Sequence, residues 1–79
     1  MMVTLSLELR DDVYRGLVMV AEACSIANKQ RDGATTHGPL DAKTLLLMLA
    51  EDAAMGHSQP GSWEAANMLE VLAAHGYQL

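Results

Sequence analysis

Aromatic residues and cysteine are scarce in this chain, which has no Phe, one Trp, two Tyr and one Cys among its 79 residues. A single cysteine excludes an internal disulfide. A chain this short buries only about 60% of its unfolded surface, so one copy alone should be marginally stable. Reinforcement is therefore expected from a bound metal or from a second subunit.

Long apolar runs are also missing. The longest is the six-residue run Leu45–Ala50, whereas a membrane-spanning helix needs about 20 residues. No basic stretch precedes an apolar run at the N-terminus, so no secretory signal is expected. The sequence therefore predicts a cytoplasmic protein without a membrane partner, in which Cys24 is a free thiol.

Positive charge is limited to five Lys and Arg, against ten Asp and Glu, giving a formal net charge of −5. This balance argues against general binding to phosphate backbones or anionic lipid. What the chain does have is 51% hydrophobic residues, carried mainly by Ala, Leu and Met, which favour helices over strands. We expect residues 1–79 to form a single domain.

Residues 3–10 alternate strictly between apolar and polar side chains. Such a period of two is typical of a strand with one buried face. The side chains expected on the buried face are Val3, Leu5, Leu7 and Leu9. Those expected on the other face are Thr4, Ser6, Glu8 and Arg10.

A first helix is predicted to follow, with Asp11 or Asp12 as its N-cap. Its apolar stripe, at steps of four and three residues, consists of Val13, Leu17, Val20, Cys24 and Ala27. Gly16 lies within this helix, where it either permits close backbone packing or is simply tolerated at a cost of about 1 kcal/mol. The helix is expected to stop at Gly33.

A second helix is predicted after a loop over residues 33–39. Either Asp41 is its N-cap, or Gly38 caps it with Pro39 in the first helical position. It is expected to run to about Met55 and to end at Gly56. Its run Leu45–Leu49 is apolar around the whole circumference, which favours burial on every side by a second subunit.

A third helix is predicted to begin after Ser62 as N-cap and to end at Gly76. With Gly76 in the left-handed conformation, Tyr77 would lie beside Leu72 in the last turn.

The predicted strand has no partner within the chain, and a lone strand leaves its backbone polar groups unpaired. Pairing with the same strand of a second molecule would form an antiparallel ribbon. We therefore expect an α+β, mainly helical homodimer with one N-terminal strand and three helices per chain. Its expected interface residues are Val3, Leu5, Leu7, Leu9, Leu45, Leu46, Met48 and Leu49. The expected core residues are Leu5, Leu7, Leu9, Val13, Leu17, Val20, Leu45, Leu46, Met48, Leu49, Leu69 and Leu72.

Catalytic and metal-binding signals are absent from the sequence. His37, His57 and Cys24 are separated by long, uneven gaps, and no zinc-ligand spacing, P-loop or nucleophile motif occurs. His75 fits the negative end of the third helix. We therefore expect no cofactor, no metal and no enzymatic activity.

The order strand, helix, helix over residues 3–55 resembles the ribbon-helix-helix family of dimeric DNA-binding regulators and antitoxins. The resemblance implies that the outward side chains of the ribbon read base edges in the major groove. It also implies a phosphate anchor at the start of the second helix. The residues that it assigns to DNA binding are Thr4, Ser6, Glu8, Arg10 and Lys43.

The alternative is a small dimeric adaptor that binds a partner protein and no DNA. About ten residues, 31–40, separate the two helices, where the family has a short turn. Glu8 would also carry negative charge into the groove. In this alternative the exposed ribbon or the third helix binds the partner, with Trp63 as a natural anchor.

Overall fold

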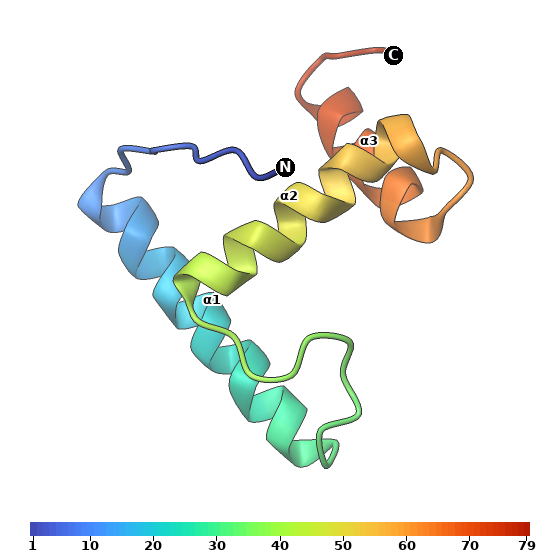
Figure 1. The fold of residues 1–79 in the computed structure, drawn as a ribbon. Helices are drawn as coiled ribbons and strands as arrows, with labels where there is room; N and C mark the ends of the chain where they lie inside the picture. Colours follow the sequence, from blue (N-terminus) through green and yellow to red (C-terminus); the bar gives the residue numbers. More distant parts are fainter. The chain divides into compact units, whose positions relative to one another are not determined.

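The computed structural model describes residues 1–79 and contains three helices and no strand (Figure 1). The helices are α1 (Asp11–Gln30), α2 (Ala42–Ser58) and α3 (Trp63–Ala74). The three predicted helices are therefore confirmed, but the α+β fold class is wrong because the protein is all-helical.

Residues 1–10 form no strand and lead into α1 as an irregular segment (Figure 1). The last of them, Arg10, has an extended backbone, with φ −63° and ψ 149°. A strand exists only through hydrogen bonds to a neighbouring backbone, and the chain offers no second strand. The alternation in the sequence therefore does not by itself create a sheet.

The start of α1 has no side-chain cap, because Arg10 occupies the N-cap position predicted for an aspartate. Asp11 and Asp12 lie instead in the first turn, where their charges favour the positive end of the helix dipole. The helix ends before Asp32, whose φ of 51° is in the left-handed region. The amide of Gly33 then donates to the carbonyl of Asn28 at 2.9 Å. The left-handed residue that ends the helix is therefore Asp32, one residue before the predicted Gly33.

Helix α2 begins directly after Asp41, which agrees with the Asp41 start and not with the Pro39 start. It runs to Ser58, past the end predicted at Gly56. Gly56 lies inside the helix, and the Cδ2 atom of Leu69 stands 3.8 Å from the place that a Cβ would take. This distance is ordinary van der Waals contact, so the packing of Leu69 does not require a glycine here, and the helix end predicted at Gly56 is wrong.

Helix α3 has the two ends that the sequence predicts. The hydroxyl of Ser62 accepts a hydrogen bond from the Ala65 amide at 3.1 Å, which is an N-cap bond. Gly76 has a φ of 96°, and the Tyr77 amide donates to the Leu72 carbonyl at 3.0 Å. These bonds form a Schellman motif, so both predicted ends of α3 are confirmed.

The chain divides into two compact units, which we call unit 1 (Met1–Ala42) and unit 2 (Lys43–Leu79). Only Ala21 in unit 1 and Leu45 and Ala65 in unit 2 are buried. Of the predicted core, only Leu45 is therefore buried. Five of its members are half-buried: Leu17, Leu46, Met48, Leu69 and Leu72. The other six are exposed: Leu5, Leu7, Leu9, Val13, Val20 and Leu49.

Candidate functional site

Polar chemistry is sparse in this protein. No group of three or more His, Cys, Asp or Glu side chains could hold a metal ion, and no polar or charged side chain is buried. Cys24 is a half-buried free thiol. The Nδ1 atom of His37 lies 2.7 Å from the hydroxyl of the adjacent Thr36 at the surface. None of the three helices has the length and apolar character that a membrane span requires. What stands out chemically is the apolar surface.

The N-terminal segment, residues 1–10, exposes every apolar side chain that the sequence assigned to a buried face. Leu5 is 82% exposed and Leu7 is 70% exposed, with Val3 and Leu9 also at the surface. The four aliphatic side chains are consequently available to another molecule.

The residues assigned to DNA binding are all exposed. Thr4, Ser6 and Glu8 lie in the N-terminal segment, outside any regular element. Arg10 forms an ion pair with Asp12, with Nε 3.3 Å from Oδ1, and both side chains are largely in solvent, so the pair adds little stability. Lys43 is in the first turn of α2, so no ribbon gathers these side chains on one face.

The interface residues predicted in α2 are mostly covered within the chain. Leu45 is buried, Leu46 and Met48 are half-buried, and Leu49 lies just inside the exposed range. Leu47, the middle residue of the run, is 57% exposed. One side of the helix is therefore exposed to solvent, and the prediction that the helix is buried around its whole circumference is wrong.

The loop that follows α1 is bonded to one face of the helix. The Ser25 hydroxyl both donates to the Leu40 carbonyl and accepts from the Leu40 amide, each at 2.9 Å. Thr35 also bonds the side chain of Asn28 through its hydroxyl. The side chains on this face are buried or half-buried: Leu17, Val18, Ala21, Cys24, Ser25 and Asn28.

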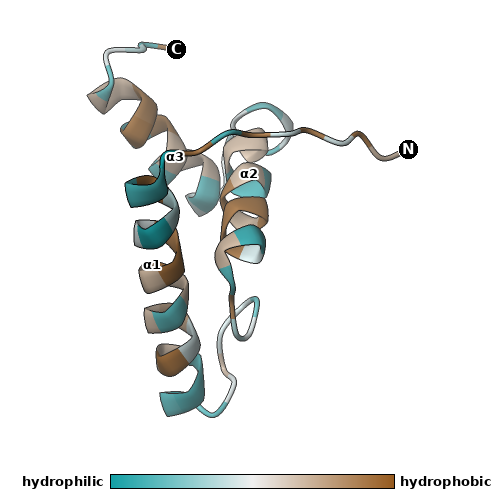
Figure 2. Ribbon diagram, turned by 90° about the vertical axis from the view of Figure 1, so that its left-hand side faces the viewer, coloured by the Kyte–Doolittle hydropathy of each residue, from teal (hydrophilic) through white to brown (hydrophobic).

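A second apolar face of α1 is exposed and carries Val13 and Val20. Met19 is 65% exposed and Ile26 is 59% exposed, but these two side chains lie on another side of the helix, about 100° or more around its axis. In Figure 2 hydrophobic residues recur along α1 between hydrophilic ones. The single apolar stripe predicted for this helix combines residues of both faces. The position of Gly16 between Val13 and Val20 is the sequence feature that distinguishes the second face.

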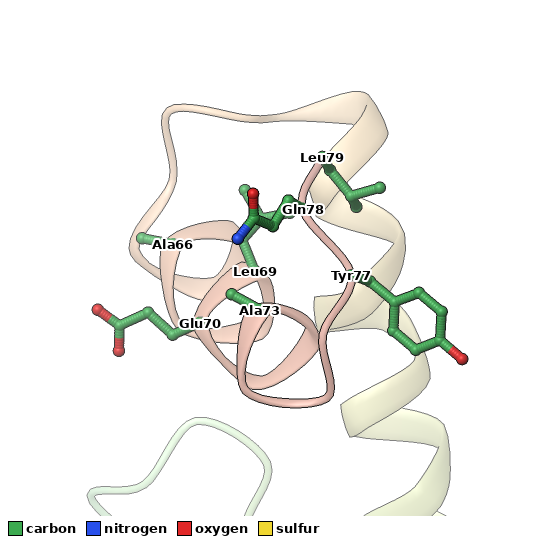
Figure 3. A pocket seen from close by; sticks show the side chains of 7 residues that line it. All are labelled: Ala66, Leu69, Glu70, Ala73, Tyr77, Gln78 and Leu79. Carbon is green, nitrogen blue, oxygen red and sulfur yellow. The ribbon is translucent and has the colours of Figure 1, made fainter.

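Unit 2 has an open depression of about 420 Å³ between α3 and the C-terminal residues (Figure 3). Its lining side chains are Ala66, Leu69, Glu70, Ala73, Tyr77, Gln78 and Leu79. Glu70 and Tyr77 point to opposite sides in this view. At the other end of α3, Trp63 is 66% exposed, as the adaptor alternative requires of an anchor residue.

Most of the large apolar side chains are at the surface. Seventeen large hydrophobic residues are exposed, against three buried hydrophobic residues, two of which are alanines.

Comparison with known proteins supplies no family for this chain: no family model, curated protein or solved structure is significantly similar to it.

Proposed function

We propose that this protein is a small helical protein-interaction module that acts as a homodimer. The observation that carries the proposal is the exposure of seventeen large hydrophobic side chains, against three buried hydrophobic residues. Exposed apolar surface of this kind is typical of protein interaction sites, and obligate homodimer interfaces are the most hydrophobic class. A second copy of the chain would cover such side chains.

The exposed side chains support a protein partner over a nucleic acid. Leucine, methionine, valine and tryptophan side chains contribute to protein interfaces through burial of apolar area. Nucleic-acid binding depends on Lys and Arg opposite phosphates, and this chain has only five, against ten acidic residues. The proposed DNA-reading side chains also lack the ribbon that would present them in a groove.

Sedimentation equilibrium of the full chain over a range of micromolar concentrations tests the proposal. We expect a species of twice the 8.5 kDa chain mass and a melting temperature that rises with protein concentration. A folded monomer throughout that range would contradict the proposal, because the protein would then be stable without a second copy.

Gel-shift titration with duplex DNA at low salt separates the two function classes. We expect no shift. A complex that weakens steeply as salt is added would be counterion release, and it would restore the DNA-binding regulator in place of the interaction module.

A further inference from the structure

We infer that the exposed apolar face of α1 is the dimer interface, and that it packs antiparallel against the same face of a second copy. The inference rests on the proposed function and deepens it by naming the surface. The face carries the exposed side chains of Val13 and Val20, and the small residues between and beyond them, Gly16, Ala23 and Ala27, are exposed as well.

The spacing along this face is that of a helix–helix seam. Successive positions are three and four residues apart, as in the a and d positions of a heptad. The seam residues are Val13, Gly16, Val20, Ala23 and Ala27. No charged residue interrupts this seam, whereas Arg15, Glu22 and Lys29 repeat every seven residues on another side of the helix.

Gly16 provides room for a close approach. No atom lies within 4 Å of the place that a Cβ of residue 16 would take, so nothing in the chain itself requires a glycine there. A glycine inside a helix costs about 1 kcal/mol relative to alanine. A neighbouring helix backbone at this position would account for the residue.

Charge favours the antiparallel orientation. Residues 10–12 at the start of α1 carry a net charge of −1, from Asp11, Asp12 and the Arg10 that pairs with Asp12. Residues 29–32 at its end carry a net charge of +1, from Lys29, Arg31 and Asp32. Antiparallel helices place opposite charges at each end of the pair, while parallel helices place like charges together. The antiparallel register that pairs a with d positions sets Val20 against Ala23 of the second copy, so larger side chains meet smaller ones.

The same register sets Gly16 against Ala27 of the second copy. This arrangement is isologous, because each contact occurs twice about a two-fold axis. A second copy is therefore a complete partner for the face, and no other molecule has to be assumed.

The substitution Ala23→Arg tests the surface. Residue 23 is exposed in the chain and arginine is a good helix former, so the fold should persist by circular dichroism. We expect the dimer dissociation constant to rise at least about tenfold, which corresponds to about 1.4 kcal/mol. The matched control Glu22→Gln changes the net charge by the same amount on the neighbouring, charged side and should leave the constant within about twofold.

An unchanged dissociation constant in Ala23→Arg, with a dimeric wild type, would overturn this interface while leaving the proposed function intact. A monomeric wild type would overturn both. The two failures are therefore distinguishable in the same sedimentation experiment.

Disulfide trapping tests the orientation. In a Cys24→Ala background, the single variants Gly16→Cys and Ala27→Cys are oxidised separately and as a mixture. The two-fold axis places residues 16 of the two copies about 16 Å apart along the helices, too far for a disulfide. We expect the mixed dimer by mass spectrometry, and dominant disulfides in the separate samples would instead indicate parallel helices and overturn the inference.

Discussion

Unit 2 closes both ends of α3 with its own residues, whereas α1 in unit 1 begins without a side-chain cap and ends through a strained aspartate. Ser62 and Gly76 bound α3 in unit 2, and Arg10 and Asp32 bound α1 in unit 1. Unit 2 also contains Leu45, the one large side chain that is buried.

Charge separates the units as well. Unit 1 contains four of the five basic residues, and unit 2 has only Lys43 at its first position. The difference between the ends of the two helices indicates that residues next to α3 define where it begins and ends. The longer helix α1 depends more on contacts away from its ends. Three substitutions should break or sharpen this contrast.

The largest effect is expected from Leu45→Ala in unit 2. Removing a buried leucine side chain should lower the free energy of unfolding by about 2–4 kcal/mol, measured by urea denaturation followed by circular dichroism. The control is Leu47→Ala, two residues away and 57% exposed, which should cost less than about 1 kcal/mol. Equal losses in the two variants would show that Leu45 is not the centre of unit 2.

A smaller loss is expected from Gly76→Ala at the end of α3. The backbone at residue 76 has a φ of 96°, which an alanine adopts at a cost of about 1 kcal/mol. Thermal melts should show this decrease. Gly61→Ala is the control, because residue 61 has no left-handed φ and no atom near the place of a Cβ. If both substitutions were neutral, the Schellman motif would contribute no stability to α3.

The smallest effect, and a gain, is expected from Asp32→Gly at the end of α1. Glycine adopts the φ of 51° without the steric penalty, so stability should rise by about 0.5 kcal/mol, part of the relief being offset by the greater freedom of the unfolded chain. Asp32→Ala retains a Cβ and should show no gain in the same melts. A loss in Asp32→Gly would mean that the aspartate side chain itself stabilises this turn.

The sequence predicted best the features that depend on a few neighbouring residues. Ser62 and Gly76 act through bonds to residues within five positions, so their roles follow from local chemistry. The helix end predicted at Gly56 is wrong because a glycine ends a helix only where the backbone turns into the left-handed region. The φ of Gly56 is not positive, and the helix continues to Ser58.

The N-terminal segment shows the limit of periodicity. Alternation of Leu5 and Leu7 with polar residues states which side chains would share a face in an extended chain, but a sheet also requires a second backbone. The two faces of α1 were merged for a similar reason. Both Val18 and Val20 are apolar, and only the position of Leu40, held by Ser25, decides which face is covered.

The double hydrogen bond between Ser25 and Leu40 has a consequence for engineering the chain. It fixes the far end of the loop to α1 across fifteen residues of sequence, independently of what lies between. Doubling the length of a flexible loop costs only about 0.6 kcal/mol of closure entropy. An epitope or fluorophore-binding peptide inserted after Gly33 should therefore leave the helix and its anchor in place, which makes this loop the natural position for a label.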